Sequence, residues 1–338
     1  MKKTMLHLMR VAGAFTPFRI ANRDKALILT YHRFSRSGEG ETTSARAFDE
    51  QLRYLTTRYR IVPLATVAEH LSRGQALPAG IAAIAIDDGY RDAYEIAFPI
   101  LRKFNAPATL FVVTDFVDRK VWLWTDKVRF LVTHSKTENL DITINNRVLS
   151  LKLDGPALRL EAAARINSAL KLAPDDLKDH VIFEIATLLG VRLPGTPPAE
   201  FGPISWAQAR EMDAAGVQIG SHTATHPILT RVSDGRLRME VCDSRSRLEA
   251  MLNREVDLFC YPNGDYDERV ARAVRAAGYR CAVTVEAGLN GIDSDLLRLR
   301  RVHTDNNFAR FLQSTSGFEQ VKNRLVIAGR RVAAGASN

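Results

Sequence analysis

The chain has 338 residues, enough for one large domain or two smaller ones, and its hydrophobic fraction of 46% fits a globular protein. Its net charge of +9 comes from scattered arginines and a C-terminal cluster, with no basic run interleaved with aromatic residues, so nucleic acid is excluded as an expected partner. The positive charge is either a solvated surface or a sign of affinity for an anionic glycan, a phospholipid headgroup or a lipid-linked diphosphate sugar.

The first 25 residues are expected to form an amphipathic segment. His7 and Arg10 interrupt its weakly apolar stretch, which therefore makes a poor signal-peptide core. The apolar positions fall mostly on one side of a helix, at Leu6, Met9, Val11 and Phe15. Such a helix either packs against the body of the protein or makes peripheral contact with a membrane surface. No run approaches the ~20 apolar residues of a transmembrane helix, so we expect the cytoplasm or its membrane face as the location.

Seven short apolar runs are typical of strands and alternate with helical patterns. The runs are 26–31, 81–87, 108–114, 217–221, 256–261, 281–285 and 297–303. Start signals for the intervening helices are found at Ser44, Asp92, Ser233 and Asp267. The alternation predicts an α/β fold with a parallel sheet, and seven units predict a barrel with one strand fewer than the eight-stranded kind. A C-terminal helix and a basic tail are expected over 319–338.

Residues 116–203 break this rhythm between the third and fourth strands. The stretch contains Trp122 and Trp124, then a predicted hairpin over 141–153, further helical patterns and a proline-rich end. It is too long for a plain connection, so we expect an inserted subdomain. The insertion either covers the active face and shapes substrate choice or contributes stability alone. Trp124 is a candidate substrate-binding residue, because aromatic faces suit the apolar faces of sugars.

Three cysteines, Cys242, Cys260 and Cys281, fall in predicted apolar elements. Their odd number argues against a disulfide scaffold. We expect them to be small buried side chains of a protein in a reducing compartment.

Chemically active side chains gather where the predicted strands end. They are His32 after the first strand, Asp87 and Asp88 after the second, His222 and His226 after the fourth, Tyr261, Pro262 and Asn263 after the fifth, and His303 at the end of the seventh. In a β/α barrel these ends converge on the face that holds the active site. Two aspartates and two histidines supply three metal ligands and one spare carboxylate, which suits a catalytic metal site rather than a closed structural one.

These motifs resemble those of the polysaccharide deacetylases, the NodB-homology group that forms carbohydrate esterase family 4. The first family motif reads Ala85-Ile-Asp-Asp-Gly89 here, and the second reads His222-Thr-Ala-Thr-His226. The opening Leu29-Thr-Tyr-His-Arg33 is similar to that of the exopolysaccharide-modifying branch. The resemblance covers about residues 26–318, outside the insertion, and implies a distorted (β/α)7 barrel.

The resemblance also implies an activity, the hydrolysis of the N-acetyl amide of an amino sugar in a polysaccharide or lipid-linked glycan, which releases acetate. Asp88, His222 and His226 would bind a divalent metal, with zinc expected first and cobalt, nickel or iron compatible with the same ligands. Asp87 would be the general base, and the backbone amide of Tyr261 would help to stabilise the oxyanion.

Two further roles follow from the resemblance. His303 would be the general acid, although its spacing differs by two positions from the family motif, and His32 is the second candidate. Pro262 and Asn263, beside Tyr261, would contact the substrate.

The third family motif is altered in this chain. Cys260 stands where the family carries an arginine that orients the catalytic base, and the tryptophan of the fourth motif is not recognisable. Arg33, Arg91 and Arg301 are all candidates to replace that arginine. The missing arginine keeps a non-catalytic carbohydrate-binding protein open as an alternative, and a hydrolase of another linear or cyclic amide is a second one.

Overall fold

The computed structural model describes residues 13–38 and 42–318. Residues 1–12 of the predicted N-terminal amphipathic segment and all of the predicted C-terminal segment, 319–338, therefore lie outside the described residues. Within the described part, α2 (Thr16–Ala21) is a short helix that precedes the first strand. No helix in this part of the chain is both long enough and apolar enough to cross a membrane.

The centre of the molecule is a closed barrel of parallel strands. The strands are β1 (Leu27–Tyr31), β5 (Ile81–Ile86), β6 (Ala108–Val112), β9 (Val217–Ser221), β10 (Leu258–Cys260), β11 (Cys281–Ala287) and β12 (Leu299–His303). They follow the order β1-β12-β11-β10-β9-β6-β5, and pairing of β1 with β5 closes the ring. The predicted seven-stranded α/β barrel is thus confirmed.

The barrel is irregular in two places. β9 and β10 share a single residue pair, Phe259 with Ser221, and a register shift interrupts β11 and β12. The short strand β4 (Arg60–Ile61) pairs with the start of β5, and β6 pairs with its end. The barrel is therefore distorted, as the resemblance implied.

Burial explains why the strands are continuously apolar. All six residues of β5 are buried, as are all five of β1 and of β6. Parallel strands covered on both faces have no alternation of polar and apolar residues. One hydrophobic cluster, which includes Phe48, Leu110 and Phe259, packs the surrounding helices against the strands. The other, which includes Ile28, Phe111 and Val283, fills the inside of the barrel.

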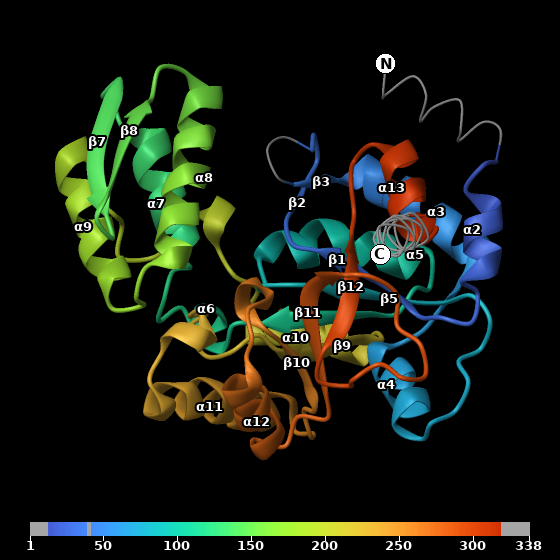
Figure 1. Cartoon of the computed structure of the whole chain (residues 1–338). Helices are drawn as coiled ribbons and strands as arrows, with labels where there is room; N and C mark the ends of the chain where they lie inside the picture. Colours follow the sequence, from blue (N-terminus) through green and yellow to red (C-terminus); the bar gives the residue numbers. More distant parts are fainter. Residues whose placement is uncertain (1–12, 39–41, 319–338) are drawn as a thin grey trace, which may run out of the picture.

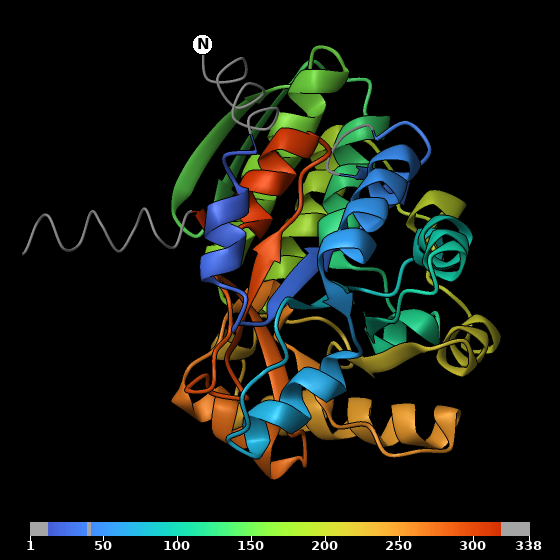
Figure 2. The same ribbon diagram turned by 90° about the vertical axis from the view of Figure 1, so that its right-hand side faces the viewer.

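Helices surround the barrel in Figure 1 and Figure 2. They are α3 (Ala45–Arg58), α4 (Leu64–Ser72), α5 (Phe98–Lys103), α6 (Thr114–Val117), α10 (Trp206–Ala214), α11 (Asp234–Leu252), α12 (Glu268–Ala276) and α13 (Phe308–Thr315). The predicted caps Ser44, Ser233 and Asp267 each accept a backbone hydrogen bond at a helix start. Asp92 does not cap its helix. It accepts hydrogen bonds from Arg33 instead and is followed by the π-helix η1 (Ala93–Ala97).

The insertion forms a separate lobe, shown in green in Figure 1. It contains α7 (Trp124–His134), the hairpin strands β7 (Asn139–Ile144) and β8 (Arg147–Lys152), α8 (Pro156–Leu172) and α9 (Leu177–Leu189). Asn145 and Asn146, at the hairpin turn, have φ of 48° and 62°, which matches the tight turn that asparagine pairs favour. The lobe has its own hydrophobic core, which includes Val128, Ile166 and Ile185.

One expectation about the cysteines is wrong. Cys260 and Cys281 are buried in the barrel, but Cys242 is exposed on α11. The sequence pattern of α11 did not distinguish its two faces, because Val241 beside it is fully buried.

Candidate metal centre and active site

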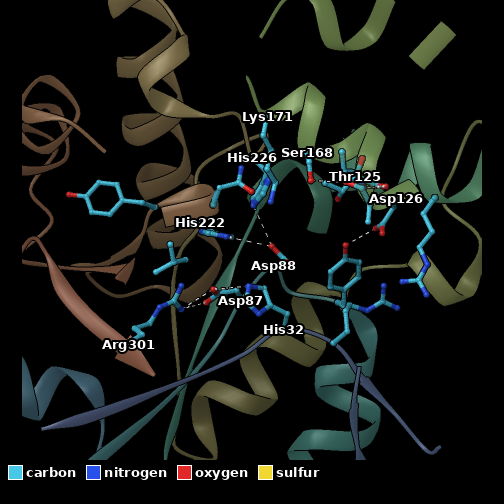
Figure 3. Close-up of a pocket in the computed structure, with 18 residues that line it drawn as sticks. His32, Asp87, Asp88, Thr125, Asp126, Ser168, Lys171, His222, His226 and Arg301 are labelled. Atoms are coloured by element: carbon cyan, nitrogen blue, oxygen red, sulfur yellow. Dashed lines mark hydrogen bonds and ion pairs between the residues drawn. The ribbon is translucent and has the colours of Figure 1, made fainter. Parts of the chain in front are cut away.

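A cavity of about 430 Å³ opens at the carboxyl ends of the strands, between the barrel and the insertion. Its lining includes seven of the residues that the sequence singled out, His32, Asp87, Asp88, His222, His226, Tyr261 and Asn263 (Figure 3). Convergence at this face is expected for side chains that follow parallel barrel strands. The structure therefore brings most of the predicted site residues into one place.

Asp88, His222 and His226 form a compact, buried group suited to a cation. One ligand atom from each lies within 4.8 Å of the others. Each imidazole Nε2 is 3.5 Å from Oδ1 of Asp88. One carboxylate and two imidazoles are a donor set that divalent transition metals prefer. These residues fit a divalent metal, and the donor set alone does not select which one.

Hydrogen bonds and burial prepare the histidines for this role. Nδ1 of His222 donates to the backbone carbonyl of Cys260 at 2.7 Å, which holds the ring with Nε2 toward Asp88. Burial, assisted by the charge of His222, lowers the pKa of His226 to about 3, so its ring is neutral. Burial raises the pKa of Asp88, but the neighbouring imidazoles of His222 and His226 outweigh it and lower the pKa below its ordinary value.

A second group, Asp87, His222 and Cys260, also has ligand atoms within 4.8 Å of one another. It is a poorer metal site for two reasons. Burial raises the pKa of the Cys260 thiol, whereas a metal needs the thiolate. Asp87 is already paired with Arg301. The Asp88 group is therefore the better fit for a cation.

The loop that carries both histidines is held in an unusual backbone conformation. Thr223 and His226 have φ of 71° and 62°, in the left-handed region that threonine and histidine seldom adopt. The hydroxyl of Thr223 accepts a hydrogen bond from the amide of His226 at 3.0 Å. Glu240 of α11, only 2% exposed, accepts hydrogen bonds from the amides of Ala224 and Thr225 at 3.0 and 2.8 Å. These contacts offset the strain and fix the direction of the imidazoles.

Glu240 is a residue that the sequence analysis missed. Its other oxygen accepts from the hydroxyl of Thr225 at 2.5 Å and from Arg236 at 2.8 Å. A glutamate in the middle of an amphipathic helix carries no sequence signal for such a role, because most glutamates at such positions are solvated.

Asp87 lies beside the metal ligands but is held by other partners. Its side chain is 1% exposed, and Nη1 of Arg301 lies 2.8 Å from both carboxylate oxygens. Nε2 of His32 is 3.4 Å from Oδ2. Burial alone raises the pKa of Asp87, but the charges of Arg301 and His32 lower it below its ordinary value. The carboxylate is thus ionised and able to accept a proton.

Arg301 resolves the alternatives left by the altered third motif. It is 1% exposed on β12, and Nε also donates to the carbonyl of Thr284 at 2.6 Å. Arg33 instead pairs with Asp92 at 2.6 Å. The Arg91 guanidinium packs against Gly202 instead. Of the three candidates, Arg301 is the one that contacts Asp87.

The backbone at the aspartate pair explains the glycine that follows it. Asp88 has a φ of 75° and Gly89 a φ of 85°. A Cβ on Gly89 would lie 2.9 Å from the Val112 side chain, closer than real Cβ atoms approach. The turn that sets Asp88 apart from Asp87 therefore requires glycine at position 89.

The predicted oxyanion role of the Tyr261 amide is not supported by its geometry. The amide donates to the carbonyl of Val283 at 3.3 Å, within the pairing of β10 and β11, and the phenol donates to Leu297. Asn263 offers a donor instead. Its Nδ2 is buried without a hydrogen-bond partner among the described residues, and the residue lines the cavity.

Three predicted site residues lie outside the cavity lining. Trp124 is 7% exposed and belongs to the core of the insertion, where Lys178 lies over its ring. Pro262 is buried beneath the site. His303 is exposed at the end of β12 and does not line the cavity. It still lies near the site, because partial burial and the charges of His32 and Arg301 lower the pKa of its imidazole. Its role as general acid therefore stays a prediction.

A second group of cavity residues was missed altogether. The hydroxyl of Tyr90 donates to Oδ2 of Asp126 at 2.6 Å, and the Arg33 guanidinium lies 3.9 Å from the centre of the Tyr90 ring. Burial raises the pKa of Asp126 to about 6. Tyr90 directly follows the Asp-Asp-Gly motif, which could have drawn attention to it, but Asp126 lies in the insertion without any motif.

Comparisons with known proteins identify a matching family. The family model described as polysaccharide deacetylase matches residues 74–282, more than half of the chain. The candidate polysaccharide deacetylase YxkH of Bacillus subtilis (strain 168) is 22% identical over 279 residues, which cover 82% of this chain and 71% of YxkH.

Solved structures share the fold. The Streptococcus pyogenes deacetylase PplD in complex with acetate has a TM-score of 0.58 and 20% identity, over 86% of this chain and 98% of PplD. IcaB from Ammonifex degensii has a TM-score of 0.55 and 20% identity, over 87% of this chain and 97% of IcaB. The family match, together with the aspartate pair and the two histidines in one cavity, identifies the chain as a member of the polysaccharide deacetylase family.

Proposed function

We propose that this protein removes the N-acetyl group from an amino sugar of a polysaccharide or lipid-linked glycan, with a divalent metal, and releases acetate. The observation that carries the proposal is the division of labour between adjacent carboxylates. Asp88 faces His222 and His226, whereas Asp87 is held by Arg301 and stays ionised. Zinc is the first metal to test, because two imidazoles and one carboxylate are ligands that it prefers in proteins.

The side chains divide the reaction among themselves. A divalent cation held by Asp88, His222 and His226 supplies a Lewis acid for a carbonyl oxygen and for water. Asp87 takes a proton from the attacking water as the new C–O bond forms. Asn263 donates a hydrogen bond to the substrate through its unpartnered amide.

Proton delivery to the leaving group falls to His32 in this proposal. It lines the cavity, its side chain is 45% exposed, and its Nε2 is 3.4 Å from Asp87. When the C–N bond breaks, the amine nitrogen needs one proton, and His32 is placed to give it. The products are then acetate and a free amino sugar, with all protons accounted for.

The Arg301–Asp87 pair also argues against a non-catalytic carbohydrate-binding protein. That alternative depended on the missing arginine of the third motif, and Arg301 provides the contact from another strand. A pure binding site has no need for a buried, arginine-paired carboxylate beside a metal set, because such a pair is costly to desolvate.

The test is acetate release by the metal-reconstituted protein on a panel of N-acetylated glycans, with small cyclic amides as a second substrate class. We expect acetate from at least one N-acetylated glycan. Asp87→Asn should lower turnover by at least ~10²-fold while metal content, measured by elemental analysis, stays at the wild-type level. His222→Ala should lower metal content itself. Turnover of cyclic amides alone, or an active metal-loaded Asp87→Asn protein, would contradict the proposal.

A further inference from the structure

Helix α8 of the insertion presents two different faces. Ala164, Asn167, Ser168 and Lys171 line the cavity of the metal site. Their spacing of three, four and seven residues places them on one stripe of a helix. The buried positions, which include Ile166 and Leu170, lie on the other side and fill the core of the insertion. The cavity-facing residues are therefore not needed for the hydrophobic core of the insertion.

Helix α7 completes this side of the cavity. Thr125, Asp126 and Arg129 line it, while Trp124 and Val128 point into the core of the insertion. Figure 3 shows Thr125, Asp126, Ser168 and Lys171 on the opposite side of Asp88 from Arg301. We call the cavity-lining residues of the two helices, 125, 126, 129, 164, 167, 168 and 171, the α7–α8 wall. It carries no aromatic ring, so the substrate part that it contacts is recognised by polar groups and charge.

The charges of the wall are unbalanced. Arg129 and Lys171 form no hydrogen bond or ion pair through their side chains with any residue in the described ranges; Arg129 is bonded only through its backbone carbonyl, by Thr133. The charge of Arg129 acts on Asp126 at longer range. The other two cations of the cavity are already paired, Arg301 with Asp87 and Arg33 with Asp92. Two cations of the wall thus face one carboxyl group, and that group accepts the Tyr90 hydroxyl.

An unsatisfied buried atom lies on the same stripe. Oδ1 of Asn167 has no hydrogen-bond partner among the described residues, although its Nδ2 donates to the carbonyl of Thr125 at 3.3 Å. A buried acceptor without a partner costs free energy unless a ligand or water supplies the donor. A sugar hydroxyl is such a donor, and Asn167 lies one helical turn from Lys171 on the stripe.

We propose that the α7–α8 wall binds an anionic group, a carboxylate or a phosphate, on the part of the glycan next to the N-acetylated sugar. This inference rests on the proposed deacetylase function. Arg129 offers a planar fork that matches either oxyanion, and Lys171 adds a mobile point charge at the rim. Asn167 accepts from a neighbouring hydroxyl. The substrate class is therefore an acidic or phosphate-linked N-acetylated glycan rather than a neutral one.

Matched substrates test this inference. Acetate release would be measured on neutral N-acetylglucosamine oligomers, on oligomers that alternate N-acetylglucosamine with a uronic acid, and on N-acetylglucosamine linked to a diphosphate. We expect a higher kcat/KM on one anionic class, and which class it is separates a carboxylate from a phosphate. In the double variant Arg129→Gln, Lys171→Gln the ratio of anionic to neutral kcat/KM should fall at least about tenfold. Added salt should lower the wild-type ratio as well.

Arg192→Gln is the matched control. Arg192 is an exposed cation of the same insertion, but it lines a different cavity, so it removes the same charge without touching the wall. Its ratio should stay at the wild-type value. No anionic preference in the wild-type protein, or an equal effect of the double variant on both substrate classes, would overturn the inference while leaving the deacetylase function intact.

A binding titration separates the two proposals. The same oligosaccharides would be titrated into wild-type protein and the double variant in the presence of a metal chelator. Anionic binding that the double variant loses, combined with no acetate released from any glycan by the metal-loaded protein in the separate activity assay, would retain the wall and refute the deacetylase function. Equal binding of neutral and anionic oligomers would count against the wall whatever the activity.

Discussion

Arg301 and Asp87 lie 214 residues apart in the chain and meet at 2.8 Å, each with a side chain only 1% exposed. The arginine comes from β12, whereas the position that lacks it, Cys260, is the last residue of β10. The contact therefore preserves an arginine–aspartate pair even though the arginine has moved to another strand.

Replacing Arg301 should harm both stability and activity. Arg301→Gln leaves the Asp87 carboxylate buried without its cation, a change that costs about 3–5 kcal/mol in other proteins. Arg301→Lys keeps a charge but cannot donate to Thr284 and Asp87 together, so we expect an intermediate loss. Denaturant unfolding and acetate release measure the two effects. A glutamine variant with wild-type values for both would show that the pair has neither role.

Glu240 is predicted to control metal affinity from a distance. The Glu240 carboxylate accepts three hydrogen bonds from the histidine loop and one from Arg236. Glu240→Gln removes its negative charge, so the imidazoles lose their fixed direction. Changes of this kind typically weaken metal binding by ~10–100-fold. Titration of the apo protein with Zn²⁺ measures the effect without reference to turnover.

The control lies on the same helix. Glu249 also pairs with an arginine four residues earlier, Arg245, but makes no contact with the histidine loop. Glu249→Gln should leave Zn²⁺ affinity near the wild-type value. Equal losses in the two variants would mean that helix stability, not the loop, sets the affinity.

His32 and His303 are predicted to differ sharply. His32 lines the cavity and contacts Asp87, whereas His303 is exposed and does not line the cavity. His32→Gln should lower kcat by about 10²–10⁴-fold, the range for loss of general acid–base catalysis. His303→Gln should change kcat little. The reverse order would reinstate His303 as the proton donor.

Trp124 is predicted to act on stability rather than on substrate choice. Trp124→Ala opens a hole in the core of the insertion and should cost about 3–5 kcal/mol. Phe183→Ala is a fitting control, because that ring is 72% exposed. Thermal denaturation and a glycan-binding titration on the same proteins separate the two roles. Weakened binding with an unchanged melting temperature would return Trp124 to the substrate site.

Asp126 makes stability depend on pH. Burial raises its pKa to about 6, so the folded protein binds more protons than the unfolded chain between pH 4 and 6, and stability falls as pH rises through this range. Asp126→Asn keeps an acceptor for the Tyr90 hydroxyl and removes the titration. The difference in the free energy of unfolding between the variant and the wild type should therefore be up to roughly 3 kcal/mol more favourable to the variant at pH 7 than at pH 4. Urea unfolding of the metal-free proteins across pH measures the difference, and parallel curves would rule it out.

The parts of the site that were predictable depend on the backbone. Asp87, Asp88, His222 and His226 follow strand ends, and a parallel barrel brings such ends together whatever the details of packing. Seven apolar runs sufficed for the barrel because every residue of β1 and β5 is buried and, apart from Thr30, hydrophobic.

The parts of the site that could not be predicted from the sequence depend on the directions of side chains and on strand pairing. Arg301, Arg33 and Arg91 are equivalent in the sequence, and only the facing of β12 toward Asp87 selects Arg301. Trp124 begins a helix whose two faces both contain apolar residues, so its burial in the lobe had no local signal. The amide of Tyr261 is committed to Val283 by strand pairing, which a motif does not record.

The two cores of the molecule have a consequence for how its substrate range can change. The catalytic aspartates and histidines depend on the barrel, while the α7–α8 wall stands on the separate core of the insertion. Substitutions on the cavity-facing stripe of α8 alter neither core. Variation between related chains can therefore exchange the glycan that is recognised without rebuilding the machinery that cleaves the amide, and transplanting the wall residues onto a relative is a rational route to redirect it.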